Sequence, residues 1–141
     1  MGRPLDIDIN TPNCTGCHIC EMVCSLYHEK VINLDKARIR VKDKWDESLF
    51  VPHICQLCEL ADCLEACPTS ALSQDNRGII HVDMELCTGC ESCVIACPHE
   101  AILWSNEFER LFVCDRCDGD PNCVKTCSSS ALALNGNNRK A

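Results

Sequence analysis

The chain has few aromatic residues and no long apolar segment. Aromatic residues make up 4% of its 141 positions, and the 46% counted as hydrophobic includes 16 cysteines. A small chain with so little ordinary apolar surface does not bury enough of it to stabilise a core, so we expect something else to stabilise the fold. No apolar run approaches about 18 residues, the length of a membrane-spanning helix, so direct membrane insertion is not expected.

Positive charge is also scarce. Lysine and arginine total 13 against 21 aspartates and glutamates, which gives a formal net charge of −8. Such a chain should avoid nucleic acid and anionic lipid and should favour partners with basic docking surfaces. Residues 1–10 carry no apolar segment of the kind that marks a signal peptide. We therefore expect a cytoplasmic protein whose cysteines stay reduced and bind metal, because disulfides are rare in that compartment.

Cysteine is abundant, and it occurs in four runs of four. In the first and third runs, each of the first two gaps between cysteines is two residues long and the last gap is three residues long. This is the bacterial ferredoxin spacing for [4Fe–4S] clusters. The second and fourth runs widen the middle gap to four and five residues. The runs are Cys14, Cys17, Cys20 and Cys24; Cys55, Cys58, Cys63 and Cys67; Cys87, Cys90, Cys93 and Cys97; and Cys114, Cys117, Cys123 and Cys127.

The third run shows how such a segment can serve two clusters. Gly89 removes a Cβ where the backbone has to approach cluster sulfides. The segment from Cys93 to Cys97 predicts one helical turn, from which both cysteines project on one face. Because the fourth cysteine of a ferredoxin run ligates the other cluster, this turn is expected to lie between two clusters.

A short phrase is repeated after three of the runs. Cys67-Pro-Thr-Ser-Ala-Leu recurs as Cys97-Pro-His-Glu-Ala-Ile and as Cys127-Ser-Ser-Ser-Ala-Leu. The first run lacks the phrase and has Ser25 after its last cysteine. No linker rich in proline, glycine or serine separates the repeats, so we expect tightly fused modules.

Alternating apolar and polar residues predict short strands. Residues 75–78 have hairpin-turn chemistry, and residues 43–48 are a polar turn that contains Trp45. The predicted strands are residues 6–9, 37–42, 78–83 and 108–113.

Sixteen cysteines fill four four-cysteine sites with none left over, which predicts four [4Fe–4S] clusters and no [3Fe–4S] centre. Zinc is the main alternative metal. A single tetrahedral zinc ion uses paired knuckles and makes poor use of three cysteines at this spacing. A zinc-dependent interaction module is therefore the less favoured function. Among other nearby side chains, His53 and His99 are expected to be solvated, with donation to cluster sulfur as the alternative. Trp45 and Trp104 are expected to pack or form an interface, with electron relay as the alternative. The expected surface cations are Arg110, Arg116 and Lys125, and the alternative for these three is local compensation of cluster charge.

At these cysteines the sequence resembles the four-cluster, ferredoxin-like electron-transfer subunits of molybdenum and tungsten oxidoreductases. That group includes partners of dimethyl sulfoxide reductase, formate dehydrogenase and nitrate reductase, and the resemblance covers residues 14–134. The short length and the first cysteine run look most like the small iron–sulfur subunits of cytoplasmic tungsten aldehyde oxidoreductases. The subunits of class II benzoyl-CoA reductase and of carbon monoxide dehydrogenase are similar.

The resemblance implies an α+β fold of two fused two-cluster ferredoxin-like modules with short helices and small antiparallel hairpins. Residues 1–34 plus 105–141 would form an outer module, and residues 35–104 an inserted one. The ligand sets it implies are Cys14, Cys17, Cys20 and Cys127 (set I); Cys24, Cys114, Cys117 and Cys123 (set II); Cys55, Cys58, Cys63 and Cys97 (set III); and Cys67, Cys87, Cys90 and Cys93 (set IV). Ser25 and Ser128 stand where prolines often do, so the turns after set II and set I cysteines need not follow the family geometry.

The resemblance also implies an electron-transfer function in which no residue of this chain is catalytic. Such a subunit relays single electrons between a large tungsten or molybdenum catalytic subunit and a ferredoxin or a flavin (FAD/NAD) subunit, typically in anaerobes. The loops at residues 59–62 and 118–122 are the expected partner-specific surfaces. A free soluble polyferredoxin is the alternative. Self-stacking through the tails, residues 1–13 and 135–141, is a further prediction.

Overall fold

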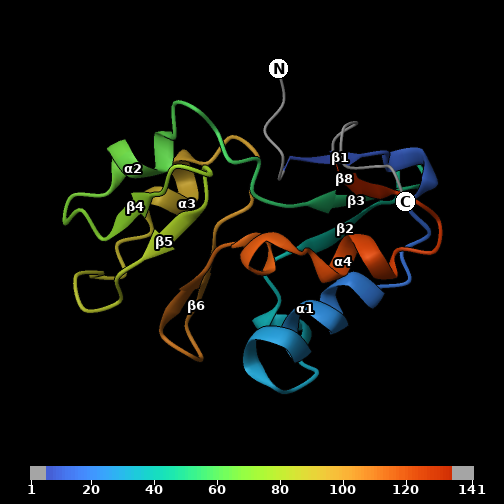
Figure 1. Cartoon of the computed structure of the whole chain (residues 1–141), viewed down its shortest axis with the longest axis horizontal. Coiled ribbons are helices and arrows are strands. Elements are labelled where there is room, and N and C mark those ends of the chain that lie inside the picture. The colour runs from blue at the N-terminus through green and yellow to red at the C-terminus, as the bar shows by residue number, and fades with distance from the viewer. Residues whose placement is uncertain (1–5, 135–141) are drawn as a thin grey trace.

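The computed structural model describes residues 6–134 as short helices and short strands in alternation (Figure 1). In chain order the elements are β1 (Ile7–Ile9), η1 (Thr11–Asn13), α1 (Ile19–Glu29), η2 (Leu34–Lys36), β2 (Arg40–Lys44), β3 (Leu49–His53), α2 (Asp62–Ala66), β4 (Leu72–Gln74), β5 (Ile80–Val82), α3 (Ser92–Ala96), β6 (Leu103–Ser105), β7 (Arg110–Phe112), η3 (Arg116–Gly119), α4 (Asn122–Thr126) and β8 (Leu132–Leu134). This is an α+β architecture of few helices and small antiparallel hairpins, as predicted.

Among the described residues the strands form two-stranded antiparallel sheets. Three are hairpins between chain neighbours, β2–β3, β4–β5 and β6–β7. In the fourth, β1 pairs with β8, so that Ile7 lies opposite Leu134 and Ile9 opposite Leu132. This long-range pair joins the two ends of the described chain.

The helices pack in two pairs that follow the cysteine runs. Helix α1, from the first run, packs on α4, from the fourth, and α2, from the second run, packs on α3, from the third. In Figure 1, α2, α3, β4 and β5 lie together on one side, while α1, α4, β1 and β8 lie on the other. Pairing of this kind brings cysteines from distant parts of the sequence close to one another.

The core is one contiguous group of buried side chains, in which cysteines are interleaved with aliphatic residues. Cys24, Cys63 and Cys93 are buried in it beside residues such as Ile39 and Ile102. Thiols therefore occupy volume that a conventional core would fill with larger apolar side chains. This agrees with the expectation that apolar burial alone does not account for the fold.

The predicted strands at residues 6–9, 78–83 and 108–113 are confirmed as β1, β5 and β7, and the hairpin turn at residues 75–78 is confirmed between β4 and β5. The strand predicted at residues 37–42 begins later, at Arg40, and continues to Lys44. Strand β3 was not predicted, because Pro52 lies within it opposite Val41. In a two-stranded sheet a proline can turn its missing N–H outward.

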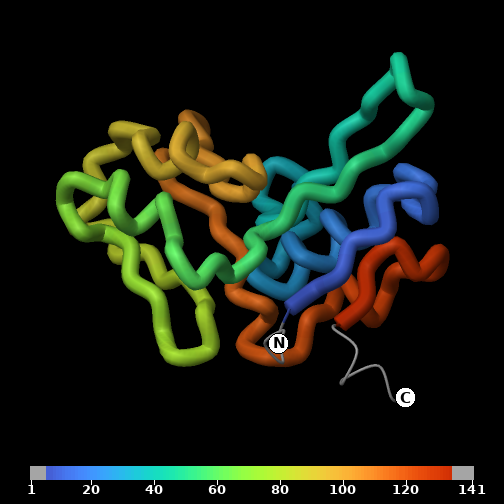
Figure 2. The backbone as a smooth tube through the Cα atoms, turned by 90° about the horizontal axis from the view of Figure 1, so that it is seen from above, coloured from blue at the N-terminus to red at the C-terminus, as the bar shows by residue number. Residues whose placement is uncertain are grey.

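The turn end of the β2–β3 hairpin extends away from the rest of the chain (Figure 2), whereas β3 packs against η1. Trp45 lies in the turn of this hairpin with 81% of its surface exposed, so it does not pack within the described chain. A role in an interface remains the prediction for this side chain. The tails predicted to self-associate are described only from residue 6, and residues 1–5 and 135–141 lie outside the described part. Within residues 6–134, no helix has the length and apolar character required to cross a bilayer.

Candidate metal centres

Three cavities are each lined by four cysteines from two different runs. The cavities are lined by Cys14, Cys17, Cys20 and Cys127; by Cys55, Cys58, Cys63 and Cys97; and by Cys67, Cys87, Cys90 and Cys93. In each cavity three thiols come from one run and the fourth from its helix-paired partner run.

The remaining four cysteines come from α1, α4 and residues 114–117. Cys24, Cys114, Cys117 and Cys123 are all buried. Burial raises the pKa of the Cys123 thiol, and the neighbouring thiols of Cys114, Cys24 and Cys117 raise it further. All sixteen cysteines are free of disulfides in the described part of the chain. They therefore gather as four groups of four reduced thiols.

The thiols differ in how readily they ionise. Burial raises the pKa of Cys20 and Cys55 to about 12 and that of Cys93 to about 11. Hydrogen bonds with Thr69 and Ser92, respectively, lower the pKa of Cys67 and Cys90. Because a metal ligand must be a thiolate, metal binding has to displace protons from the buried thiols.

The repeated phrase builds a turn that returns a backbone N–H to its own cysteine. Ala71 N donates to Cys67 Sγ at 3.3 Å, and Ala101 N donates to Cys97 Sγ at 3.4 Å. The residue before each buried alanine has a positive φ: Ser70 at 56°, Glu100 at 52° and Ser130 at 59°. Left-handed residues that are not glycine are uncommon, so this geometry is a specific feature of the phrase. N–H···S bonds of this kind stabilise charge on sulfur and tune cluster potentials.

The first run lacks the phrase and obtains its donors elsewhere. Arg38 N donates to Cys24 Sγ at 3.2 Å, from fourteen residues along the chain. His28 Nδ1 lies 2.9 Å from the Cys24 carbonyl oxygen and 3.7 Å from its sulfur, and Nε2 lies 2.7 Å from Asp115 Oδ1. Burial opposes charge on His28, but these hydrogen bonds, led by that to Asp115, raise its pKa to about 10. The sequence did not predict either contact, because the closeness of these residues to Cys24 in space depends on the length of α1.

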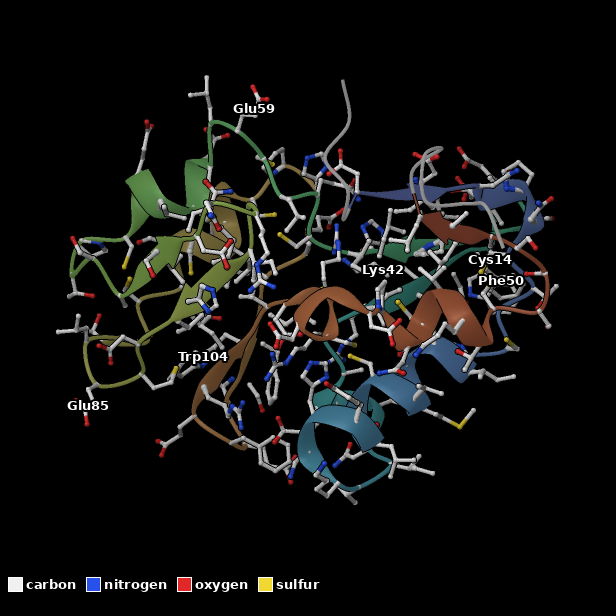
Figure 3. All side chains as sticks on the ribbon, viewed as in Figure 1. Cys14, Lys42, Phe50, Glu59, Glu85 and Trp104 are labelled. Carbon is white, nitrogen blue, oxygen red and sulfur yellow. The ribbon has the colours of Figure 1, made fainter. Side chains whose placement is uncertain are left out.

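Two aromatic rings cover the cysteine loops of the first and third runs. A Cβ on Gly16 would meet the Phe50 ring at 2.6 to 2.8 Å, and one on Gly89 would meet the Trp104 ring at 3.1 Å. Both glycines have positive φ, 71° and 74°. Figure 3 shows Phe50 beside Cys14 in one half of the molecule and Trp104 in the other. The ring and the backbone conformation explain Gly89 directly, in addition to the predicted approach to cluster sulfides, and Trp104 is confirmed as a packing residue.

The other side chains near cysteines divide into buried and exposed ones. His53 Nδ1 contacts the His99 carbonyl oxygen, at 3.1 Å, and not a sulfur. Lys125 is exposed and pairs with Asp120, as expected of a surface cation. For Arg116 the prediction of a surface cation is wrong, because this side chain is 0% exposed.

A family model described as a 4Fe–4S dicluster domain matches residues 46–137. Among curated proteins, the polyferredoxin-like subunit of aliphatic sulfonate oxidoreductase from Pyrococcus furiosus is 42% identical over 86 residues, which are 60% of this chain and 49% of the relative. The thiosulfate reductase electron transfer subunit PhsB of Salmonella typhi is 30% identical over 86 residues, which are 57% of this chain and 45% of the length of that relative. The chain thus spans about half the length of these relatives.

Solved structures of the active-site complex BamBC of benzoyl coenzyme A reductase have a similar fold. In the complex as isolated, the match covers 91% of this chain and 74% of the other, with a TM-score of 0.53 and 24% identity. The complex with 1,5-dienoyl-CoA gives a TM-score of 0.54 at the same identity. At this identity the likeness is one of fold.

Proposed function

The chain belongs to the 4Fe–4S dicluster domain family, and from this we propose that it is an iron–sulfur electron-transfer subunit of a multi-subunit oxidoreductase, without a catalytic role of its own. The observation that carries the proposal is the gathering of sixteen reduced thiols into four groups of four. The printed names of the relatives, an electron transfer subunit and a polyferredoxin-like subunit, agree with it.

We propose that each group holds one [4Fe–4S] cluster, with sets I to IV as the ligands. The donor chemistry fits: thiols are the ligands of such clusters, and backbone N–H groups already point at Cys24, Cys67, Cys97 and Cys114. Clusters supply reversible one-electron transfer when bound. The residues of the chain hold them, exclude water and fix the charge around them.

The proximity of thiols in different sets supports a linear relay. Cys20 of set I is near enough to Cys123 of set II to raise its pKa. Cys114 of set II likewise raises the pKa of Cys55 in set III. Sets III and IV share the packed helices α2 and α3, which carry Cys63 and Cys93. The proposed order of the relay is therefore I, II, III, IV.

The two proposed modules are residues 1–34 with 105–141, and residues 35–104. The helix pairs α1–α4 and α2–α3 support this division. The boundary between residues 104 and 105 falls inside β6, whose hairpin partner β7 leads into the fourth cysteine run. On this proposal the β6–β7 hairpin connects the inserted module back to the outer one.

The finer identity of the complex rests on the family resemblance of the cysteine runs. We propose a large tungsten or molybdenum catalytic subunit as partner, of the aldehyde oxidoreductase type, in the cytoplasm of an anaerobe, with a ferredoxin or a flavin subunit at the other end of the relay. The names of the relatives point to sulfonate and thiosulfate chemistry, so a catalytic subunit acting on sulfur compounds is the second candidate.

Metal analysis after anaerobic purification tests the cofactor proposal. We expect about sixteen iron and about sixteen acid-labile sulfide per chain, with a brown colour bleached by dithionite. About four zinc ions without sulfide would support the zinc-dependent interaction module and overturn the proposal. Co-purification with a large subunit that contains tungsten or molybdenum would support the complex. Full electron-transfer activity of the chain in its cell without a stable partner would support a free polyferredoxin.

Removal of iron and sulfide should unfold the chain. The core contains cysteines where other proteins have large apolar residues, and ligation free energy becomes folding free energy when the thiols cannot pack the same way alone. After complete chelation we expect collapse of the dispersed NMR spectrum and loss of the helical circular dichroism signal. A well-dispersed spectrum of the iron-free chain would contradict this expectation.

A further inference from the structure

Among the described residues, Arg116 is the largest fully buried side chain, and no other arginine or lysine there is buried. It lies in η3, two residues after Cys114. A buried guanidinium cannot lose its proton, and its burial costs several kcal/mol unless negative charge or good acceptors surround it. The chain therefore requires negative charge or good acceptors close to this side chain.

The guanidinium reaches groups from two ligand sets. Arg116 Nη1 donates to Cys114 Sγ at 3.2 Å, and its backbone N donates to the same sulfur at 3.3 Å. Arg116 Nη2 donates to the Cys55 carbonyl oxygen at 2.6 Å. Cys114 belongs to set II and Cys55 to set III, so one side chain bridges the point where the two sets meet.

The backbone around Arg116 adopts an uncommon conformation that makes this bridge geometrically feasible. Four consecutive residues have positive φ: Arg116 at 58°, Cys117 at 50°, Asp118 at 57° and Gly119 at 110°. A left-handed conformation is unfavourable for every residue other than glycine. The turn is secured by Asp115, whose side chain accepts from Cys117 N at 2.9 Å, and by Arg77 of the β4–β5 turn, 3.2 Å from Asp118 Oδ1. The cost indicates that the position of Arg116 is specifically maintained.

The charge at this point matters because both neighbouring cysteines have to be thiolates in a loaded chain. The Arg116 guanidinium lies 3.2 Å from the sulfur of one of them, Cys114. A fixed cation that favours a thiolate also favours the extra negative charge of a reduced cluster, because each is the more negative of two charge states.

We propose that Arg116 is the electrostatic and structural bridge between sets II and III, which favours the reduced state of the cluster bound by Cys114 and holds the two sets at a fixed spacing. The proposal rests on the proposed iron–sulfur function. It makes Arg116 a positioning residue that acts on the relay at the step between the two modules.

The test is a redox titration of the anaerobically purified chain, with any partner that co-purifies, monitored by EPR. Dithionite supplies the electrons, one per cluster. In Arg116→Gln we expect one cluster to be about tenfold less reduced at a fixed potential, a fall in midpoint of about 59 mV for a one-electron couple. Arg116→Lys keeps the charge but cannot bridge two groups in a fork, so we expect a smaller fall and a lower unfolding temperature.

Lys125→Gln is the matched control, because it removes one positive charge close to the same run from an exposed side chain paired with Asp120. Solvent and salt screen that position, so we expect less than a twofold change in the reduced fraction. Arg116→Gln with full iron content and unchanged midpoints would overturn the proposal. If Arg116→Gln fails to retain iron, Arg116→Lys decides: wild-type midpoints together with a wild-type unfolding temperature would overturn it. A wild-type chain without iron would instead refute the proposed function.

Discussion

Replacing Ser25 with proline should prevent the chain from assembling its first and fourth cysteine runs. Ser25 is the seventh residue of α1 and is completely buried. A proline at an interior helical position removes a hydrogen bond and clashes with the carbonyl one turn earlier, at a cost of about 3 kcal/mol or more. That is a large part of the roughly 5–15 kcal/mol that stabilises a typical domain. We expect loss of the α1–α4 packing and of iron bound by Cys24 and its neighbours.

Two further consequences add to the helix break. The residue before a proline is driven out of helical conformation, and here that residue is Cys24 itself. The Ser25 hydroxyl donates to the Met22 carbonyl at 2.9 Å and accepts from Asn33 N at 3.1 Å, and both bonds would be lost. Far-UV circular dichroism, iron content and the unfolding temperature of the purified chain measure the effect.

The controls separate the proline from the hydroxyl. Ser25→Ala keeps the helix but leaves Asn33 N–H without this acceptor, so we expect a loss of roughly 1–3 kcal/mol with iron retained. Pro98→Ser is the reverse exchange in the third run and should be close to neutral. After α4 a serine, Ser128, already follows the cysteine, and that helix still ends at Thr126. A Ser25→Pro chain with normal iron content and helicity would contradict the prediction.

The sequence predicted the fold best where a local pattern determines it. Cysteine spacing predicted the helical turn of α3, and the alternation of residues 78–83 together with the turn before them predicted β5. The pairing of runs came from the family resemblance, and the helix packing agrees with it. No proline follows Cys24, and α1 continues past this cysteine as a helix of 11 residues in place of one turn. That extension was not predicted from the sequence.

Features that depend on long-range packing were not predicted from the sequence. Arg116 looks like any surface cation until the left-handed turn carries its side chain back to Cys114. Phe50 and Trp104 are far in sequence from the glycines they cover, and no local periodicity connects them. His28 and Arg38 reach Cys24 only because α1 continues for more than a turn beyond it. Each of these contacts requires knowing the path of the chain between its two ends.

Adding a methyl group at Gly16 should destabilise the loaded chain more than the same change at Gly89, whose backbone conformation is similar. Gly16 and Gly89 both have positive φ, so alanine pays a left-handed penalty of roughly 1–2 kcal/mol at each. At Gly16 the new Cβ would also lie 2.6 Å from the nearest atom of Phe50, a distance at which the ring has to move. Overpacking of this kind typically costs a further 1–3 kcal/mol. At Gly89 the nearest ring atoms of Trp104 lie at 3.1 Å, so a smaller shift relieves the contact.

Gly89 is the matched control for this change, because its φ of 74° is close to the 71° of Gly16 and the two backbone penalties should be similar. Gly119→Ala would not serve, because a φ of +110° lies outside the left-handed region that alanine can adopt and carries a larger backbone penalty. We expect Gly16→Ala to unfold at a lower temperature than Gly89→Ala. If the Phe50 ring is the cause, Gly16→Ala combined with Phe50→Ala should cost less than the sum of the single changes, because the clash is counted once and then removed. Equal losses at Gly16 and Gly89, with additive effects of Gly16→Ala and Phe50→Ala, would show that the backbone conformation alone requires glycine and that the Phe50 ring does not press on the first cysteine loop.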